Sequence, residues 1–213
     1  MNDSGRVEAF SDGVFAVAIT LLILEIKVPA EAGDQLLREL GHQWPSYAAY
    51  VVTFLVIGIM WVNHHTVFGF VERVDRTLLF LNLLLLLGVV ALPWAASLVA
   101  EYLAEGQEGS SLLHGSDAAH IAMAVYGSFM VYHAVVFQAL WMHLTKTGHL
   151  FDSRIDTEAA RRTRWRFGLG LIIYPCTVAL AFVSAPLALA LHGGLAVYYA
   201  LNQISVPVHD TAS

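Results

Sequence analysis

The chain has 213 residues, of which 57% are hydrophobic and 13% are charged, and its formal net charge is −6. Soluble domains carry about 25% charged residues, and a soluble protein of this length needs more polar surface than this composition supplies. We therefore expect a membrane protein. No basic run with interleaved aromatic residues indicates a nucleic-acid partner, and the single cysteine, Cys176, excludes an internal disulfide.

Six apolar segments predict an all-α protein with six transmembrane helices in one domain, 1–213, because crossing a bilayer takes about 20 mostly apolar residues. We expect the spans at about 7–27, 45–69, 77–102, 118–144, 164–184 and 187–204. Ser184-Ala185-Pro186 separates the last two, because proline disfavours helix before it and begins a helix well. A model with five spans is the weaker alternative. We expect no cleaved signal peptide, because the first apolar run ends in Glu25-Ile26-Lys27 rather than in small residues.

Lys and Arg are enriched in the cytoplasmic loops of membrane proteins. If the N-terminus is inside, only Lys27 and Arg38 lie in outer segments. The inner segments then hold nine basic residues, namely Arg6, Arg73, Arg76, Lys146, Arg154, Arg161, Arg162, Arg164 and Arg166. We therefore expect both termini in the cytoplasm.

The first span carries one stripe that could line a narrow path at a symmetry axis. Residues three and four apart share a helix face, which places Val17, Thr20, Leu21 and Leu24 on one stripe. Glu25 follows near the outer mouth, where a ring of carboxylates would concentrate cations. The alternative is a stripe that faces lipid or a neighbouring helix, with Thr20 bonded to its own backbone.

Polar residues are expected to gather at the inner end of the first three spans. A carboxylate at this depth is expensive and needs partners. The candidates for the polar network are Arg6, Ser11, Asp12, Trp61, His64 and Asn82. The favoured interpretation is a structural network that fixes the first helix, and the alternative is a proton relay in a proton-coupled transporter that uses Asp12 and His64.

The sequence gives little support for an enzyme or for a membrane redox protein. The sequence contains no Ser-His-Asp constellation, phosphate-cradling glycine loop or zinc-protease motif, so we expect no enzyme and no catalytic residue. A membrane redox protein is the least favoured alternative, because a haem needs ligands at matched depth and His64 and His133 are expected at different depths.

The segment that holds Arg6, Phe10, Ser11 and Asp12 has the pattern R-x-x-x-F-S-D. This pattern, its continuation GVFAVAITLLILEIKVP and the run WVNHH at the end of the second span resemble the transmembrane protein 175 family. That family comprises potassium channels of lysosomes with bacterial and archaeal relatives. The motifs cover about 40 residues.

The resemblance implies a potassium-selective, leak-like channel without the T-V-G-Y-G filter and without a cofactor or a metal other than permeating K⁺. It implies a homotetramer in the inner membrane of a prokaryote, with the first helices around the pore. The hydrophobic rings would be Val17, Leu21 and Leu24, with Thr20 as the polar layer. Arg6, Ser11, Asp12, Trp61 and His64 would hold the first helix. Val17 is smaller than the isoleucine of the family, so the narrowest point is expected at Leu21 or Leu24.

Overall fold

The computed structural model describes residues 4–29, 33–105, 116–164 and 168–201. The regular segments in these ranges are helices, apart from isolated bridge residues such as the antiparallel pair of Val71 and Phe151. In chain order they are α1 (Ser4–Leu21), η1 (Leu22–Glu25), η2 (Gly33–Gln35), α2 (Leu36–His42), α3 (Trp44–Phe68), α4 (Arg76–Glu105), α5 (Asp117–Thr147), α6 (Thr157–Arg162), α8 (Gly170–Ala181) and α9 (Ala185–Leu201). The prediction of an all-α protein is thus confirmed for the described ranges.

Four segments of the described chain are long and apolar enough to cross a membrane. They are Ser4–Glu25, Trp44–Phe68, Arg76–Ala104 and Asp117–Thr147. They correspond to the first four predicted spans. The helices α8 and α9, with 12 and 17 residues, match the last two predictions in place, and residues 165–167 and 202–204 of those predicted spans lie outside the described residues.

The break between the last two segments lies where the sequence predicted it. Helix α8 ends at Ala181 and α9 begins at Ala185. The Oγ of Ser184 accepts a hydrogen bond from the backbone N–H of Leu187 at 3.3 Å, as an N-cap residue does. Pro186 follows in the first turn of α9, where its missing N–H costs nothing.

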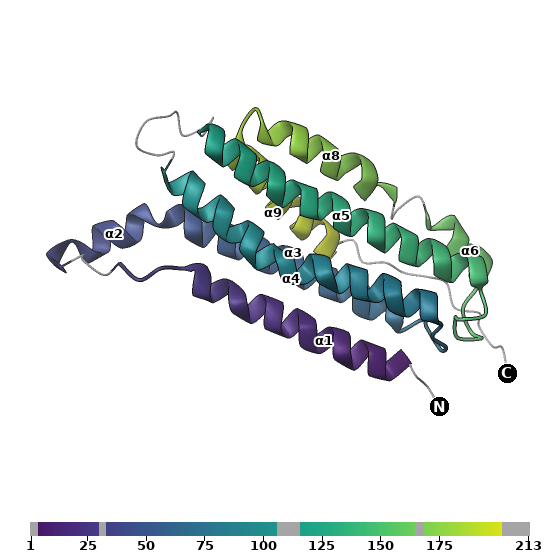
Figure 1. Ribbon diagram of the computed structural model, residues 1–213. Coiled ribbons are helices and arrows are strands. Elements are labelled where there is room, and N and C mark those ends of the chain that lie inside the picture. Colours follow the sequence, from purple (N-terminus) through teal and green to yellow (C-terminus); the bar gives the residue numbers. More distant parts are fainter. Residues whose placement is uncertain (1–3, 30–32, 106–115, 165–167, 202–213) are drawn as a thin grey trace.

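The helices form an elongated bundle with α4 and α5 at its centre (Figure 1). Helix α1 lies along one flank, against α3 and α4, and α8 lies on the opposite side, against α5 and α9. Glycines let some of these helices approach closely, as small residues do in membranes. At Gly127 of α5, an added Cβ would meet the Cγ2 of Val178 of α8 at 2.8 Å.

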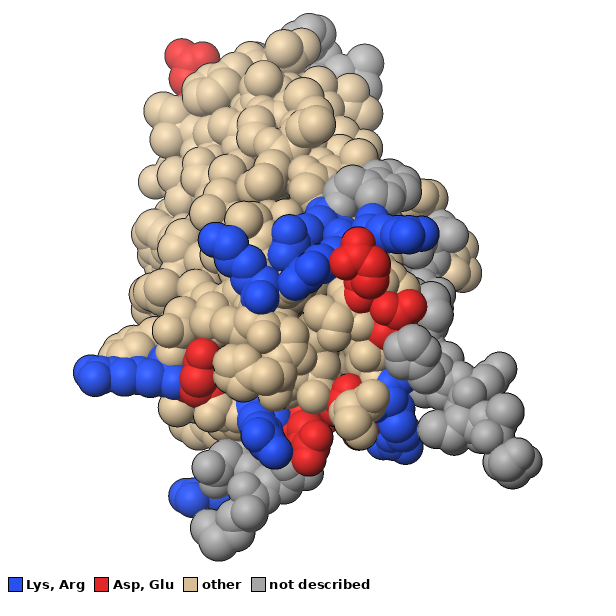
Figure 2. Space-filling model, turned by 90° about the vertical axis from the view of Figure 1, so that its right-hand side faces the viewer, with Lys and Arg blue, Asp and Glu red and all other residues tan. Residues whose placement is uncertain are grey.

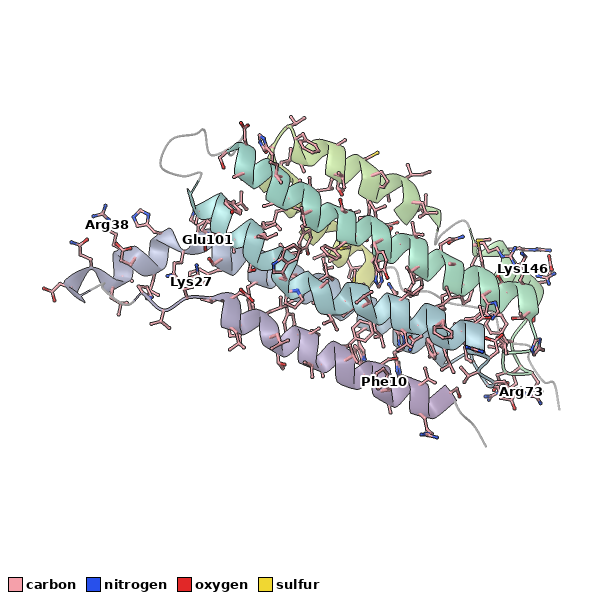
Figure 3. All side chains as sticks on the ribbon, in the orientation of Figure 1. Phe10, Lys27, Arg38, Arg73, Glu101 and Lys146 are labelled. Carbon is pink, nitrogen blue, oxygen red and sulfur yellow. The ribbon has the colours of Figure 1, made fainter. Side chains whose placement is uncertain are left out.

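The charged residues lie mainly at the two ends of the bundle. Figure 3 shows Arg73 and Lys146 at one end, and Lys27, Arg38 and Glu101 at the other. Lysine and arginine gather at the first of these ends (Figure 2). This division matches the two groups of basic residues predicted for opposite sides of the membrane, except that Arg166 lies outside the described residues.

Candidate functional site

Helix α1 has one packed face and one open face. The packed face carries Ser11, Phe15, Ala18 and Leu22, which are at most 1% exposed. On the open face, Val17 is 57%, Leu21 40% and Leu24 73% exposed, and Thr20 lies on the same side. Only 22% of the residues in the most apolar stretch of this span are buried, against 33% to 56% in the other three. The predicted stripe is therefore the part of the span that its own chain leaves uncovered.

The helix changes its winding at the outer end of the stripe. After Leu21 it continues as the 3₁₀ turn η1, which ends at Glu25. Residues three apart are eclipsed in a 3₁₀ helix, so Leu24 stands directly beyond Leu21. Ile26 is already extended (φ −81°, ψ 105°), and Pro29 disfavours helix in the residue before it. Glu25 therefore lies exposed where the helix ends, and its place at a pore mouth stays a prediction.

A buried chain of hydrogen bonds ties α1 to α3 and α4. The Nδ2 of Asn82 on α4 donates to the Oγ of Ser11 on α1 at 3.0 Å. The Nε2 of His64 on α3 lies 2.9 Å from the Oδ1 of Asn82. Because Asn82 Nδ2 is a donor, its Oδ1 must accept, so the hydrogen of His64 resides on Nε2. All three side chains are at most 2% exposed, so this network is a structural anchor of α1.

The aromatic surroundings fix the histidine of this anchor. The ring of His64 stacks on Phe68 at 4.3 Å between centroids and meets Phe15 at 5.4 Å. Its Nδ1 is buried and has no hydrogen-bond partner in the described part of the chain. His64 thus has one polar contact, through Asn82, and that contact holds its orientation.

A second, more exposed set of contacts lies one turn away. The Nε1 of Trp61 donates to the Oδ1 of Asp12 at 2.8 Å. The Nδ1 of His65 lies 2.7 Å from the Oε1 of Glu8, and the rings of His65 and Trp61 stack at 5.8 Å. Among the described residues no hydrogen bond joins Asp12 to His64. The structure therefore does not bring together the pair on which a direct proton relay would depend.

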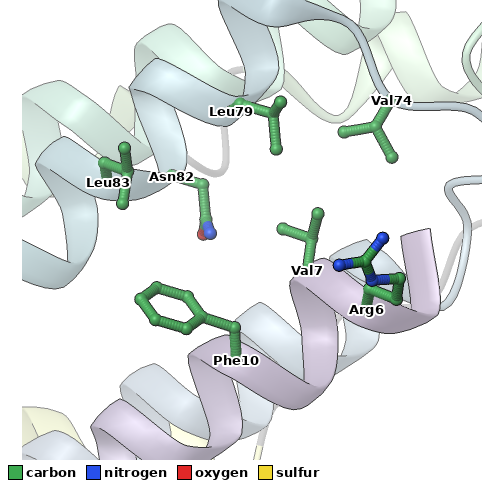
Figure 4. A pocket seen from close by; sticks show the side chains of 7 residues that line it. All are labelled: Arg6, Val7, Phe10, Val74, Leu79, Asn82 and Leu83. Carbon is green, nitrogen blue, oxygen red and sulfur yellow. The ribbon is translucent and has the colours of Figure 1, made fainter. Parts of the chain in front are cut away.

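Arg6 does not join either set of contacts within the chain. It makes no hydrogen bond or ion pair in the described ranges and lines an open groove of about 590 Å³. Arg6, Val7 and Phe10 of α1 face Leu79, Asn82 and Leu83 of α4 across this groove (Figure 4). The prediction that Arg6 belongs to the anchor is therefore not met within a single subunit.

Two interactions at the end of the bundle that holds Arg73 and Lys146 were not predicted from the sequence. One is the pair of Glu8 and His65, and the other joins Asp75 to His143 of α5, whose Nε2 lies 2.8 Å from the Asp75 Oδ2. Asp75 also caps α4, because its Oδ1 accepts from the N–H of Leu78 at 2.7 Å. Burial alone would raise the pKa of Asp75, but these two contacts outweigh it and hold the pKa below its usual value. The cap could have been predicted from the sequence, because an aspartate directly before a helix is a common N-cap residue. The ion pair with His143 could not, because no sequence pattern links the two residues.

Comparisons with known proteins find related sequences that cover most or all of this chain. The family model described as endosomal/lysosomal potassium channel TMEM175 matches residues 6–93, which contain most of α1, all of α3 and Asn82. A potassium channel of Streptomyces collinus is 63% identical over 100% of this chain and 99% of its own length. The endosomal/lysosomal proton channel TMEM175 of Gallus gallus is 31% identical over 83% of this chain, which corresponds to 35% of that longer protein.

A solved structure has the same fold over nearly the whole chain. The crystal structure of a lysosomal potassium-selective channel TMEM175 homologue from Chamaesiphon minutus superimposes with a TM-score of 0.80 and 37% identity. The match covers 95% of this chain and 98% of the other.

Proposed function

Because this chain belongs to the TMEM175 family, we propose that it is a potassium-selective, leak-like cation channel in the bacterial inner membrane. In this proposal four subunits place their first helices around one central pore. The observation that carries it is the open face of the first span, where Val17, Thr20, Leu21 and Leu24 lie uncovered opposite the packed face.

The shape of the open face supports a constriction toward the outer end. Between the inner end and Val17, the exposed positions include the small residues Ala9, Gly13 and Ala16 and one large residue, Phe10. Beyond Val17 the stripe carries the side chains of Leu21 and Leu24. Four copies of such a helix would place apolar rings at Leu21 and Leu24, and apolar constrictions gate by dewetting.

Thr20 is the polar position in this stripe. Its Oγ1 donates to the backbone carbonyl oxygen of Val17 at 2.9 Å. A threonine that faces lipid and has no role in conduction would make the same bond. The same bond uses the only hydrogen of the hydroxyl, so its lone pairs remain for an acceptor role. In a tetramer, four such oxygens would replace part of the hydration shell of a cation. Because potassium loses its water more easily than sodium, this layer would favour potassium.

The anchor of Ser11, His64 and Asn82 would fix the rotation of α1 about its own axis. A rotation by one residue, 100° in a helix of 3.6 residues per turn, would turn the stripe away from the pore. Residues Ser11, Phe15, Ala18 and Leu22 occupy the opposite face and are buried. The anchor therefore supports conduction without contacting an ion.

The membrane topology of the proposal has six spans, a single domain over 1–213 and both termini in the cytoplasm. The division of Lys and Arg between the two ends of the bundle supports this orientation. In the outer segments, Lys27 is engaged with Glu101 at 2.6 Å, which leaves that end with little free positive charge. The helices α8 and α9 would be the last two spans, and both are shorter than about 20 residues.

The experiment is ion flux through the purified, full-length protein in proteoliposomes. We expect passive potassium flux down its gradient, faster than sodium flux under the same gradient. Thr20→Val retains the shape of the side chain and removes its oxygen, so it should lower the ratio of potassium to sodium flux. Folded protein, checked by size exclusion and circular dichroism, that carries no potassium flux would refute the proposal.

A further inference from the structure

A group of three metal-ligand side chains lies at the inner end of α1. It consists of Glu8 and Asp12 of α1 and His65 of α3, and one ligand atom from each lies within 4.8 Å of the others. Glu8 and Asp12 are four residues apart, so they share a helix face. That face meets the end of α3, where His65 completes the group.

We propose that Glu8, Asp12 and His65 form a binding site for a divalent transition-metal ion of the zinc type, which bridges α1 to α3. One imidazole nitrogen and two carboxylate oxygens suit zinc, which takes His and Asp or Glu ligands in a tetrahedral arrangement. Calcium prefers six to eight oxygen ligands, and magnesium requires octahedral oxygen coordination, so neither suits a group with a nitrogen donor.

The distances permit such a site after small side-chain rotations. Ligand bonds of about 2.1 Å in a tetrahedron place two donor atoms about 3.4 Å apart. The widest separation in this group, 4.8 Å at most, must shorten by about 1.4 Å or less. The 2.7 Å between His65 Nδ1 and Glu8 Oε1 must lengthen by about 0.7 Å, as the metal replaces the hydrogen between them.

A second layer of contacts already orients two of the three ligands. Trp61 donates its Nε1–H to one oxygen of Asp12 at 2.8 Å, which leaves the other oxygen for the ion. The same indole ring stacks on His65 with an interplanar angle of 26°. Hydrogen bonds to the ligands are a general feature of metal sites and strengthen them.

Access from the solvent is also present. The side chain of His65 is 59% exposed and that of Glu8 is 25% exposed. An ion can therefore enter from the inner end, and a water molecule can occupy its fourth position. Three protein ligands with one open position are typical of exchangeable zinc sites rather than closed structural sites.

The consequence for conduction rests on the proposed function. If α1 lines the pore, an ion held between α1 and α3 would clamp the inner end of that helix. Metal added at the inner face should then slow potassium flux by restricting the movement of α1. The site would make the channel sensitive to transition metals through a contact outside the conducting stripe.

Metal binding can be measured without any flux. Cobalt is titrated into the full-length protein in nanodiscs while the visible d–d absorption is recorded, and zinc binding is measured by calorimetry. We expect one ion per subunit and an intense tetrahedral cobalt band. Glu8→Gln and His65→Gln should each weaken binding by about tenfold or more, whereas His149→Gln, which alters an exposed histidine away from the group, should not. Unchanged zinc binding in a folded Glu8→Gln protein would overturn the site, as would loss of binding in His149→Gln.

Potassium flux with zinc on the inner side then separates the two proposals. Slower flux in the wild type but not in Glu8→Gln supports the clamp. A protein that binds one zinc per subunit through Glu8 but carries no potassium flux retains the site and refutes the channel. A protein that conducts potassium but binds no zinc refutes the site alone.

Discussion

Asn82→Leu tests the anchor of α1 most sharply, because the substitution retains the branching of the side chain while it removes every polar contact. Asn82 is 2% exposed and bonds Ser11 and His64 at 3.0 and 2.9 Å. After the change, Ser11 still donates to the carbonyl oxygen of Val7. His64 loses its one hydrogen-bond partner, since its Nδ1 already has none among the described residues.

The magnitude follows from that one unpaired donor. A buried polar group without a partner costs about 1–3 kcal/mol, whereas side-chain hydrogen bonds in membranes average about 0.6 and reach about 1.7 kcal/mol. We therefore expect Asn82→Leu to lower the free energy of unfolding by about 1–2 kcal/mol. The added change His64→Phe retains the stacking on Phe68 and removes the unpaired donor, so the double variant should recover most of this loss.

The assay is reversible unfolding in mixed micelles, followed by tryptophan fluorescence. Ser128→Ala is the matched control, because Ser128 is exposed and bonds only its own helix, at the carbonyl of Ala124. It should change stability by less than about 0.5 kcal/mol. Wild-type stability in Asn82→Leu, or losses that simply add in the double variant, would show that the three side chains do not act as one network.

Three further predictions address the open face, the inner-end cap and the packing of α5. Gly13→Leu should reduce potassium flux several-fold at unchanged thermal stability, because nothing in the subunit lies within 4 Å of an added Cβ, whereas Gly194→Leu, equally open, should leave flux unchanged. The pKa of Asp75 is lowered on folding, so its contribution to stability is complete above the unfolded value of 3.8 and is lost as the pH falls through the lower folded value. The melting temperatures of the wild type and Asp75→Asn should therefore differ at about pH 5 and converge as the pH falls below about 4. Gly127→Ala should cost about 1–3 kcal/mol in chemical unfolding, because the new methyl group would lie 2.8 Å from the Cγ2 of Val178.

Much of the bundle is predictable because lipid imposes simple rules. Apolar length predicted the first four spans within a few residues, and Pro186 correctly predicted the break between α8 and α9. The predicted spans 164–184 and 187–204 agree with α8 and α9 in place, and residues 165–167 and 202–204 of those spans lie outside the described ranges. The 3₁₀ turn after Leu21 was missed, because hydropathy counts apolar residues whether or not the backbone remains α-helical.

The part of the candidate site that lies on a single helix was predictable from the sequence. The spacing of Val17, Thr20, Leu21 and Leu24 fixed a common face, and the structure leaves that face uncovered. The partners across helices were less predictable, because they depend on how each helix is rotated and packed. Asp12 therefore bonds Trp61 rather than His64, and Arg6 lies in the groove instead of the anchor.

The most direct test of the pore is a comparison of two leucines that are both exposed in the subunit. Leu24 is 73% exposed in η1, the continuation of α1, and Leu87 is 63% exposed on α4. Both are changed to alanine, and passive potassium flux is measured in proteoliposomes with equal amounts of folded protein. If the open face of α1 forms the constriction, Leu24→Ala widens it and increases the flux several-fold, while Leu87→Ala leaves the flux at the wild-type rate. Equal rates in the two variants and the wild type would contradict a pore lined by the first helix.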